Sequence, residues 1–355
     1  MIKLYNFNPG PSKIPEEVLH KISKAIRNYE PINSSILEIT HRSSEFAKIL
    51  ENIEKNMIYL LNVPKEFQLL LLQGGATFQN AFIPHNISNN KKIGCLVNGH
   101  WGLKTYMDFS KVLDNVDKFE IDFELLDTIY DDKFSKLNYL HVTSNETIDG
   151  IQIRNFSKIK NSNLIVDMSS DIGSYKFNFD NISYLYAGAQ KNLGIPGVTM
   201  TIINKDFIVE NNNPSYLNLN ELMKNKSLLN TPSTFSIYVL DLILEWMVDM
   251  GGIDYFENKS IQQSNLIYDF LESYRDIFLV LEKSEFRSRS NITFNFRNKD
   301  LNNKFLEYSK ELGIVGINGH RSVGGVRVSL YNSITDDMVN FLLENIEKFL
   351  VQVLK

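Results

Sequence analysis

The sequence predicts an α/β fold, in which a large domain built on a mostly parallel sheet is joined to a smaller α+β domain. A length of 355 residues is typical of a protein with about two domains. Between about residue 16 and residue 205, continuous apolar runs alternate with helix-sized segments, which indicates a sheet covered on both faces. After Gly251 and Gly252 the pattern changes to the apolar and polar alternation of half-exposed strands.

The large domain is expected to contain six strands, one for each apolar run. The runs are 68–73, 93–97, 137–142, 163–167, 184–188 and 198–203. The segment "GGAT" (74–77) follows the first run and is expected to open a helix. The asparagine-rich segment 209–226 predicts a long surface excursion that is either functional or disordered, because loops of this length are uncommon in compact domains.

A long buried helix is expected over 233–248, "STFSIYVLDLILEWMV". Asp241 and Glu245 interrupt its apolar run, so the sequence does not predict a membrane-spanning helix here. Trp246 lies inside this run and is expected to be a core residue.

The smaller domain is expected to begin after this helix. Its predicted elements are two strands, 291–296 and 325–331, and an amphipathic helix, 336–354. We place the large domain at 16–250 and the small domain at 1–15 together with 251–355.

Composition excludes several classes of protein. The net charge is -5 and no basic block is present, so the sequence shows no electrostatic footprint for nucleic acid. Nothing like a signal peptide or a membrane span is visible, and the single cysteine, Cys95, excludes an intrachain disulfide. Cys95 lies mid-strand and is expected to be buried, which fits a reducing cytoplasm. The six histidines lack metal-ligand spacing, so no metal site is expected.

Three chemistry-bearing features directly follow predicted strands, where open α/β sheets bind their ligands. They are Asp167, Lys191 and the glycines of "GGAT". Taken singly, they also fit a helix cap, a surface lysine and a tight turn. Taken together, they are the parts that hold pyridoxal phosphate: an amine for the aldehyde, an acid for the pyridine nitrogen, and backbone donors for the phosphate.

Several motifs carry a resemblance to a known family. They are "NFNPGPSKIP" (6–15), "EITHRSSEF" (38–46), "NETIDGIQI" (145–153), "YAGAQKNLGIPG" (186–197), "NTPSTF" (230–235) and "GHRSVGGVRVSLYN" (319–332). With them the chain resembles, nearly end to end, the phosphoserine aminotransferase family, class V pyridoxal-phosphate enzymes of fold type I (aspartate aminotransferase-like). The resemblance implies pyridoxal 5'-phosphate as cofactor.

The resemblance also implies roles for individual residues. The implied cofactor ligands are Ala76 and Thr77 in the phosphate cup, Trp101 stacked on the ring, Thr147 near the 3-oxygen, Asp167 at the pyridine nitrogen, Gln190 at the phosphate, Lys191 as the covalent anchor, and Asn230 and Thr231 at the neighbouring subunit's cofactor phosphate. That last pair implies a homodimer with active sites at the subunit interface. Trp101 on its own also fits a core residue. Thr77 departs from family members that carry arginine there, which puts only that charged contact in doubt.

Two His-Arg pairs stand near the two ends of the chain: His41 with Arg42, and His320 with Arg321. Arginine's planar fork suits phosphates and carboxylates, although each arginine alone also fits a surface salt bridge. The resemblance implies that both pairs bind the substrate phosphate and that Arg327 binds the α-carboxylate.

The implied reaction transfers an amino group from L-glutamate to the phosphorylated 2-oxo acid 3-phosphohydroxypyruvate in serine biosynthesis. 4-Phosphohydroxythreonine is a second candidate substrate, in pyridoxal phosphate biosynthesis. Two alternatives stay open at this point: another class V aminotransferase, and a non-catalytic binding module of the same fold.

Overall fold

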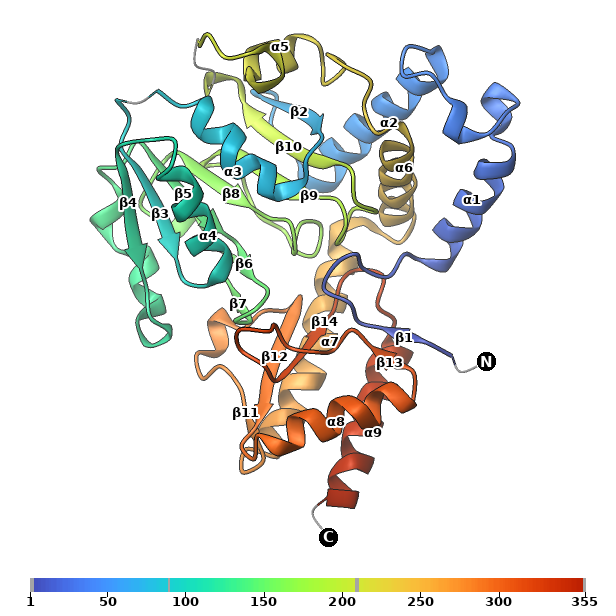
Figure 1. Ribbon diagram of the computed structural model, residues 1–355, viewed down its shortest axis with the longest axis vertical. Coiled ribbons are helices and arrows are strands. Elements are labelled where there is room, and N and C mark those ends of the chain that lie inside the picture. Colours follow the sequence, from blue (N-terminus) through green and yellow to red (C-terminus); the bar gives the residue numbers. More distant parts are fainter. Residues whose placement is uncertain (1–2, 89, 208–210, 354–355) are drawn as a thin grey trace.

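The computed structural model describes residues 3–88, 90–207 and 211–353, and Figure 1 shows their arrangement. A seven-stranded sheet forms the centre of the larger part, in the order β2-β10-β9-β8-β5-β3-β4. Its strands are β2 (Phe67–Leu72), β3 (Ile93–Val97), β4 (Val116–Glu120), β5 (Tyr139–Thr143), β8 (Leu164–Asp167), β9 (Ile182–Gly188) and β10 (Thr199–Asn204). All six predicted strands are therefore confirmed.

The sheet is mostly parallel, as predicted. β10 is the exception, because it runs antiparallel to both of its neighbours, β2 and β9. The sequence analysis missed β4, in which three of the five residues of "VDKFE" are charged. β4 pairs only with β3, and charged side chains are typical of such an edge strand, so no continuous apolar run marks it.

Helices cover both faces of the sheet. One face packs against α1 (Glu16–Arg27), α2 (Ser44–Leu61) and α6 (Thr234–Asp249), and the other against α3 (Gly75–His85), α4 (His100–Phe109) and α5 (Leu219–Lys224). Within β8, Leu164 and Val166 join the first core and Ile165 joins the second, as the period of two in a strand requires. Cys95 and Trp246 are buried, as expected.

The prediction that 209–226 forms a long surface loop is wrong in part. Residues 208–210 lie outside the described residues, but the helix α5 occupies 219–224 and buries Leu222 and Met223 beside the sheet. The side chain of Asn218 accepts hydrogen bonds from the backbone N–H groups of Asn220 and Glu221. The asparagines that suggested a loop thus include the cap of a helix.

The smaller part contains the antiparallel sheet β11 (Phe278–Leu279), β12 (Asn291–Phe296) and β14 (Val326–Ser329), covered by α8 (Asp300–Glu311) and α9 (Asp336–Val353). Near the chain start, β1 (Tyr5–Asn6) pairs in parallel with β13 (Ile314–Val315). The strands 291–296 and 325–331 and the final helix are confirmed, except that residue 354 lies outside the described residues.

The helix α7 (Gly252–Ser273) belongs to both cores. Its start packs Ile253 and Phe256 into the core of the large sheet, and its end packs Ile267 and Leu271 into the core of the small one. The domain limits at residues 16 and 250 stay a prediction.

The remaining elements are short. A two-stranded ribbon pairs β6 (Asn145–Glu146) with β7 (Ile151–Gln152). Short 3-10 helices lie at Glu30–Ile32, Ile36–Glu38, Phe123–Tyr130, Asp132–Phe134, Phe156–Lys158, Lys205–Phe207, Ser215–Leu217 and Ser284–Phe286.

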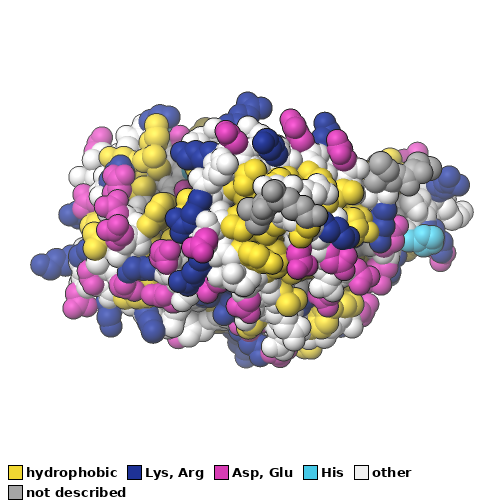
Figure 2. Space-filling model, turned by 90° about the horizontal axis from the view of Figure 1, so that it is seen from below, with side chains coloured by type: hydrophobic (Ala, Val, Ile, Leu, Met, Phe, Trp, Pro, Cys, Tyr) yellow, Lys and Arg dark blue, Asp and Glu magenta, His cyan; other side chains and the backbone are white. Residues whose placement is uncertain are grey.

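The surface seen in Figure 2 mixes lysine and arginine side chains with aspartate and glutamate side chains, and apolar side chains gather near its centre. Over the part of the chain that the structure describes, no helix is both long and apolar enough to cross a membrane. No group of three or more His, Cys, Asp or Glu side chains there is arranged to hold a metal ion.

Candidate active site

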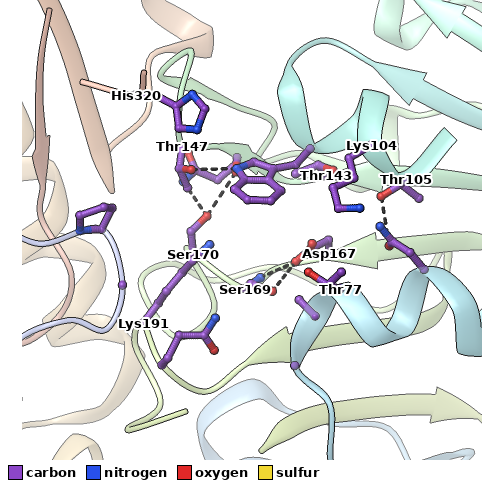
Figure 3. A pocket seen from close by; sticks show the side chains of 18 of the residues that line it. Thr77, Lys104, Thr105, Thr143, Thr147, Asp167, Ser169, Ser170, Lys191 and His320 are labelled. Atoms are coloured by element: carbon purple, nitrogen blue, oxygen red, sulfur yellow. Dashed lines mark hydrogen bonds between the residues drawn. The ribbon is translucent and has the colours of Figure 1, made fainter. Parts of the chain in front are cut away.

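A cavity of about 340 Å³ lies where the large sheet meets the small domain (Figure 3). Its walls come from the carboxyl ends of β5 and β8, the first turns of α3 and α4, the turn after β9, and the small domain. Of the predicted site residues, it is lined by Ala76, Thr77, Trp101, Thr147, Asp167, Gln190, Lys191, His320 and Arg327.

Asp167 and Lys191 supply opposite charges to this cavity. β8 ends at Asp167, and Lys191 lies three residues after the end of β9, so the parallel strands bring both to one edge of the sheet. Burial raises the pKa of Asp167, and Lys191 together with hydrogen bonds from Ser169 opposes that shift. Burial lowers the pKa of Lys191, and Asp167 opposes that shift. Each group thus favours the charged form of the other.

The first turn of α3 forms a cup of backbone donors. Gly74 (φ 97°) and Gly75 (φ 68°) adopt the left-handed conformation that favours glycine, and a Cβ on Gly74 would lie 2.6 Å from the Cβ of Phe78. α3 therefore begins at Gly75, and the N–H groups of Ala76 and Thr77 belong to the turn that lacks helical acceptors. Such a helix start favours a phosphate group.

Trp101 forms part of the cavity wall and is only half-buried, so the alternative that it is a core residue is wrong. Its indole Nε1–H donates to the hydroxyl Oγ1 of Thr147 at 2.9 Å. The Nζ of Lys191 lies 5.9 Å from the centroid of the indole ring. The ring is thus held beside the amine, where it can cover one face of a flat ligand.

Arg327 and His320 enter the cavity from the small domain. Arg327 is 8% exposed, and its Nη1 donates to the backbone oxygen of Thr147 at 3.4 Å. Burial lowers the pKa of the Arg327 guanidinium, and its Nε has no hydrogen-bond partner among the described residues. His320 contacts His100, with ring centroids 5.3 Å apart. A buried arginine with an unused donor is a ready partner for a carboxylate.

The structure does not bring the remaining predicted residues to this cavity. Arg42 and half-buried His41 precede α2, while Arg321 is exposed in the turn after His320. Asn230 and Thr231 are exposed before α6. Of the two His-Arg pairs, only His320 is among the residues that line the cavity.

Several polar residues of the cavity were missed by the sequence analysis. They are Asn80, Lys104, Thr105, Thr143, Asn145, Ser169 and Ser170. Thr143 ends β5, and Ser169 follows the end of β8, so the rule that found Asp167 could also have found them. Figure 3 shows Lys104 and Thr77 on the side of the cavity opposite Lys191.

The cavity's donors fit the predicted cofactor. The backbone cup of α3 suits a phosphate, and Asp167 suits a protonated ring nitrogen. The buried hydroxyl of Thr143, which lines the cavity, lacks a hydrogen-bond partner among the described residues, as a group that awaits a polar ligand would.

Fold and cavity together define the class of protein. The chain matches the Aminotransferase class-V family over residues 4–342, and it belongs to this family. The predicted fold class is thereby confirmed.

More closely, the chain is similar to phosphoserine aminotransferases. One from Bacillus cereus is 38% identical over 358 residues, covering 97% of this chain and 98% of the relative. The solved phosphoserine aminotransferase from Bacillus circulans subsp. alkalophilus is 33% identical with a TM-score of 0.91, covering 99% of each chain. The PLP-bound phosphoserine aminotransferase from Trichomonas vaginalis is 26% identical with a TM-score of 0.87, covering 97% of this chain and 100% of that one.

Proposed function

We propose that this protein is a phosphoserine aminotransferase that uses pyridoxal 5'-phosphate. It transfers the amino group of L-glutamate to 3-phosphohydroxypyruvate, and it releases 2-oxoglutarate and O-phospho-L-serine. The observation that carries the proposal is the one cavity in which Lys191, Asp167 and the first turn of α3 face one another. The similarity to phosphoserine aminotransferases over nearly the whole chain supports the choice of substrate.

Five residues besides Lys191 would hold the cofactor. The N–H groups of Ala76 and Thr77, with Gln190, bind its phosphate, and Trp101 covers one face of its ring. Asp167 pairs with the pyridine nitrogen. When bound, pyridoxal phosphate supplies an electron sink for the negative charge that develops at the substrate Cα.

Lys191 moves the proton in this proposal. Burial lowers the pKa of its amine, so the neutral, proton-accepting form is more accessible than for a surface lysine. The Nζ of Lys191 takes the proton from the Cα of glutamate in the first half-reaction. It returns a proton to the Cα of the product in the second half-reaction. Ser169 and the charge of Lys191 favour the carboxylate form of Asp167, which holds a positive charge on the ring nitrogen.

Arg327 binds the substrate α-carboxylate. Its burial is unfavourable without an anionic partner, and its free Nε leaves a donor for a second hydrogen bond. His320 lines the small-domain side of the cavity, and Arg321 is the exposed residue after it. In the proposal both bind the distal anion, which is a phosphate in one substrate and a carboxylate in the other.

We further propose a homodimer located in the cytoplasm. The exposure of Arg42, Asn230 and Thr231 supports it, because residues that do not line their own chain's cavity are available to a neighbouring subunit's cavity. In that arrangement His41 and Arg42 complete the phosphate site, and Asn230 and Thr231 contact the cofactor phosphate. The cytoplasmic location rests on the single, buried cysteine.

The test is an amino-transfer assay on the purified protein with glutamate and a panel of oxo acids. We expect 3-phosphohydroxypyruvate to be the best acceptor and pyruvate, which has no distal anion, to be poor. Equal use of pyruvate or glyoxylate would assign another class V aminotransferase. No transfer to any acceptor by protein that binds pyridoxal phosphate would favour a non-catalytic module.

A further inference from the structure

Glu146, at the end of β6, is a fully buried carboxylate that has no role in the proposed chemistry. Its Oε2 accepts a hydrogen bond from the backbone N–H of Trp101 at 2.9 Å, and its Oε1 accepts one from the N–H of Gly102 at 2.7 Å. Burial raises the pKa of Glu146 to about 8, against the opposing effect of these two N–H donors. A buried acid at this position requires an explanation.

The start of α4 needs an acceptor from elsewhere in the chain. The residue before the helix is Gly99, which offers no side-chain cap, so the N–H groups of the first turn lack a local partner. Glu146 supplies two acceptor oxygens, and the helix dipole opposes the larger effect of burial, which favours the neutral form of this acid. Asp149, on the same turn of chain, accepts from the N–H of His100 at 3.3 Å.

Two glycines make room for this contact. A Cβ on Gly99 would lie 2.5 Å from Cγ of Glu146. A Cβ on Gly102 would lie 2.5 Å from the backbone oxygen of Leu96 and 3.3 Å from Oε1 of Glu146. The two distances of 2.5 Å are too short for a side chain, so Gly99 leaves the space that the carboxylate occupies, and Gly102 lets the start of α4 lie against the backbone of Leu96.

Glu146 and Thr147 together hold Trp101 at both of its ends. Glu146 binds the backbone N–H of Trp101, and Thr147, the next residue, accepts the indole N–H at 2.9 Å. A hydrogen bond at each end fixes the rotation of the residue as well as its position. The indole is thereby set as a wall of the cavity rather than folded into the core.

We propose that Glu146 is a positioning residue that places the Trp101 ring over the pyridoxal phosphate site. The proposal rests on the proposed function, because it assigns the ring to that cofactor. It gives a reason for burying a carboxylate that is not among the residues lining the cavity.

The experiment uses Trp101 as its own reporter. The chain has two tryptophans, so Trp246→Phe, a change in the core helix α6, leaves Trp101 as the sole one. In this background we compare Glu146→Ala and Glu146→Gln by emission of the cofactor-free protein and by quenching on titration with pyridoxal phosphate. The matched control is Asp171→Asn, a carboxylate of equal burial that bonds to Ser144 and Gln152 instead.

We expect Glu146→Ala to shift the Trp101 emission to longer wavelength, to reduce quenching, and to raise the dissociation constant for pyridoxal phosphate by about tenfold or more. Glu146→Gln keeps one acceptor oxygen and should show a smaller change of the same kind. Asp171→Asn should leave Trp101 emission unchanged even if it lowers stability. If the alanine variant does not fold, the glutamine variant decides.

Unchanged emission and quenching in both Glu146 variants would overturn the proposal, and so would an equal change in Asp171→Asn. If the parent protein does not bind pyridoxal phosphate, the proposed function fails instead. The emission of the cofactor-free variants separates these two outcomes.

Discussion

Ser169 donates two hydrogen bonds to one oxygen of Asp167, from its backbone N–H at 2.8 Å and from its hydroxyl at 2.5 Å. The same hydroxyl accepts from the backbone N–H of Gly188 at 3.1 Å, so Ser169 also links the ends of β8 and β9. Hydrogen bonds to a carboxylate favour its charged form. The strength of Asp167 as a partner for a ring nitrogen therefore depends on Ser169.

Ser169→Ala should weaken amino transfer without abolishing it. Loss of a hydrogen bond to a charged group costs about 1.5–3 kcal/mol, and we expect kcat to fall accordingly. Asp167→Ala is the reference, since it should reduce amino transfer by far more than it reduces cofactor affinity. The measurement is steady-state transfer beside a cofactor titration for both variants. Wild-type turnover in Asp167→Ala would show that this carboxylate is only structural.

Lys191 should be the point of covalent attachment. The purified protein is expected to absorb in the visible region, and borohydride should fix the cofactor at this lysine, because its amine faces the cavity. Peptide mapping after reduction checks the site. Lys104, which lines the same cavity, is the natural comparison. An adduct on Lys104, or none at all in cofactor-loaded protein, would refute the assignment of Lys191.

Asp241 should make the protein less stable as the pH rises. Burial in α6, reinforced by Glu245, raises the pKa of Asp241 from 3.8 to about 8, while Asn52 and Lys21 oppose the shift. Because the folded-state pKa is raised, the contribution to stability is fully present below pH 3.8 and is lost as the pH rises through about 8. Asp241→Asn removes this dependence.

The effect of pH on stability is tested by denaturant unfolding at about pH 5, 6.5 and 8, at a fixed protein concentration. We expect the wild-type free energy of unfolding to fall between the extremes by on the order of 2 kcal/mol more than that of Asp241→Asn. Asp249→Asn, an exposed change at the end of the same helix, should follow the wild type. Parallel pH profiles for wild type and Asp241→Asn would contradict the prediction.

The strands of the large sheet were predictable because burial on both faces leaves an apolar run in the sequence. The charged edge strand β4 leaves none, and the six-residue helix α5, in a segment rich in asparagine, is too short to show a helical period. Strand-end position found Asp167 and Lys191, since charged residues stand out there. Ser169 and Thr143 occupy equivalent positions, so the same rule could have found them, but their side chains are those of ordinary turns and did not stand out.

The position of the His-Arg pairs could not be derived from the sequence pattern, because the separation of two residues along the chain does not determine the distance between them in the fold. His320 reaches the cavity through the turn before β14, whereas His41 and Arg42 stay outside it. The role of Glu146 was also hidden. Its partners are backbone N–H groups of Trp101 and Gly102, which no residue type in the sequence identifies.

The three arginines should differ in their effects on the two half-reactions. Arg327→Ala should damage the reactions with glutamate and with 3-phosphohydroxypyruvate alike, because both substrates carry the α-carboxylate that this buried guanidinium binds. Arg42→Ala and Arg321→Ala should impair mainly the phosphorylated oxo acid, because a phosphate uses more of these donors than the glutamate side-chain carboxylate does. Where bound substrate buries the charged contact, the expected loss is on the order of 2–5 kcal/mol, as for a truncated buried charge pair.

Single-turnover assays with each substrate measure this division, beside a cofactor titration that should be unchanged in Arg42→Ala and Arg321→Ala. The cofactor phosphate is assigned to other donors, namely the first turn of α3 and Gln190, so its affinity serves as the internal check. Arg27→Ala, an exposed change at the end of α1, is the control for the general loss of a positive charge. Equal losses for both substrates in Arg42→Ala and Arg321→Ala would remove the basis for phosphate selectivity. The protein would then be a class V aminotransferase whose acceptor is recognised by its α-carboxylate alone.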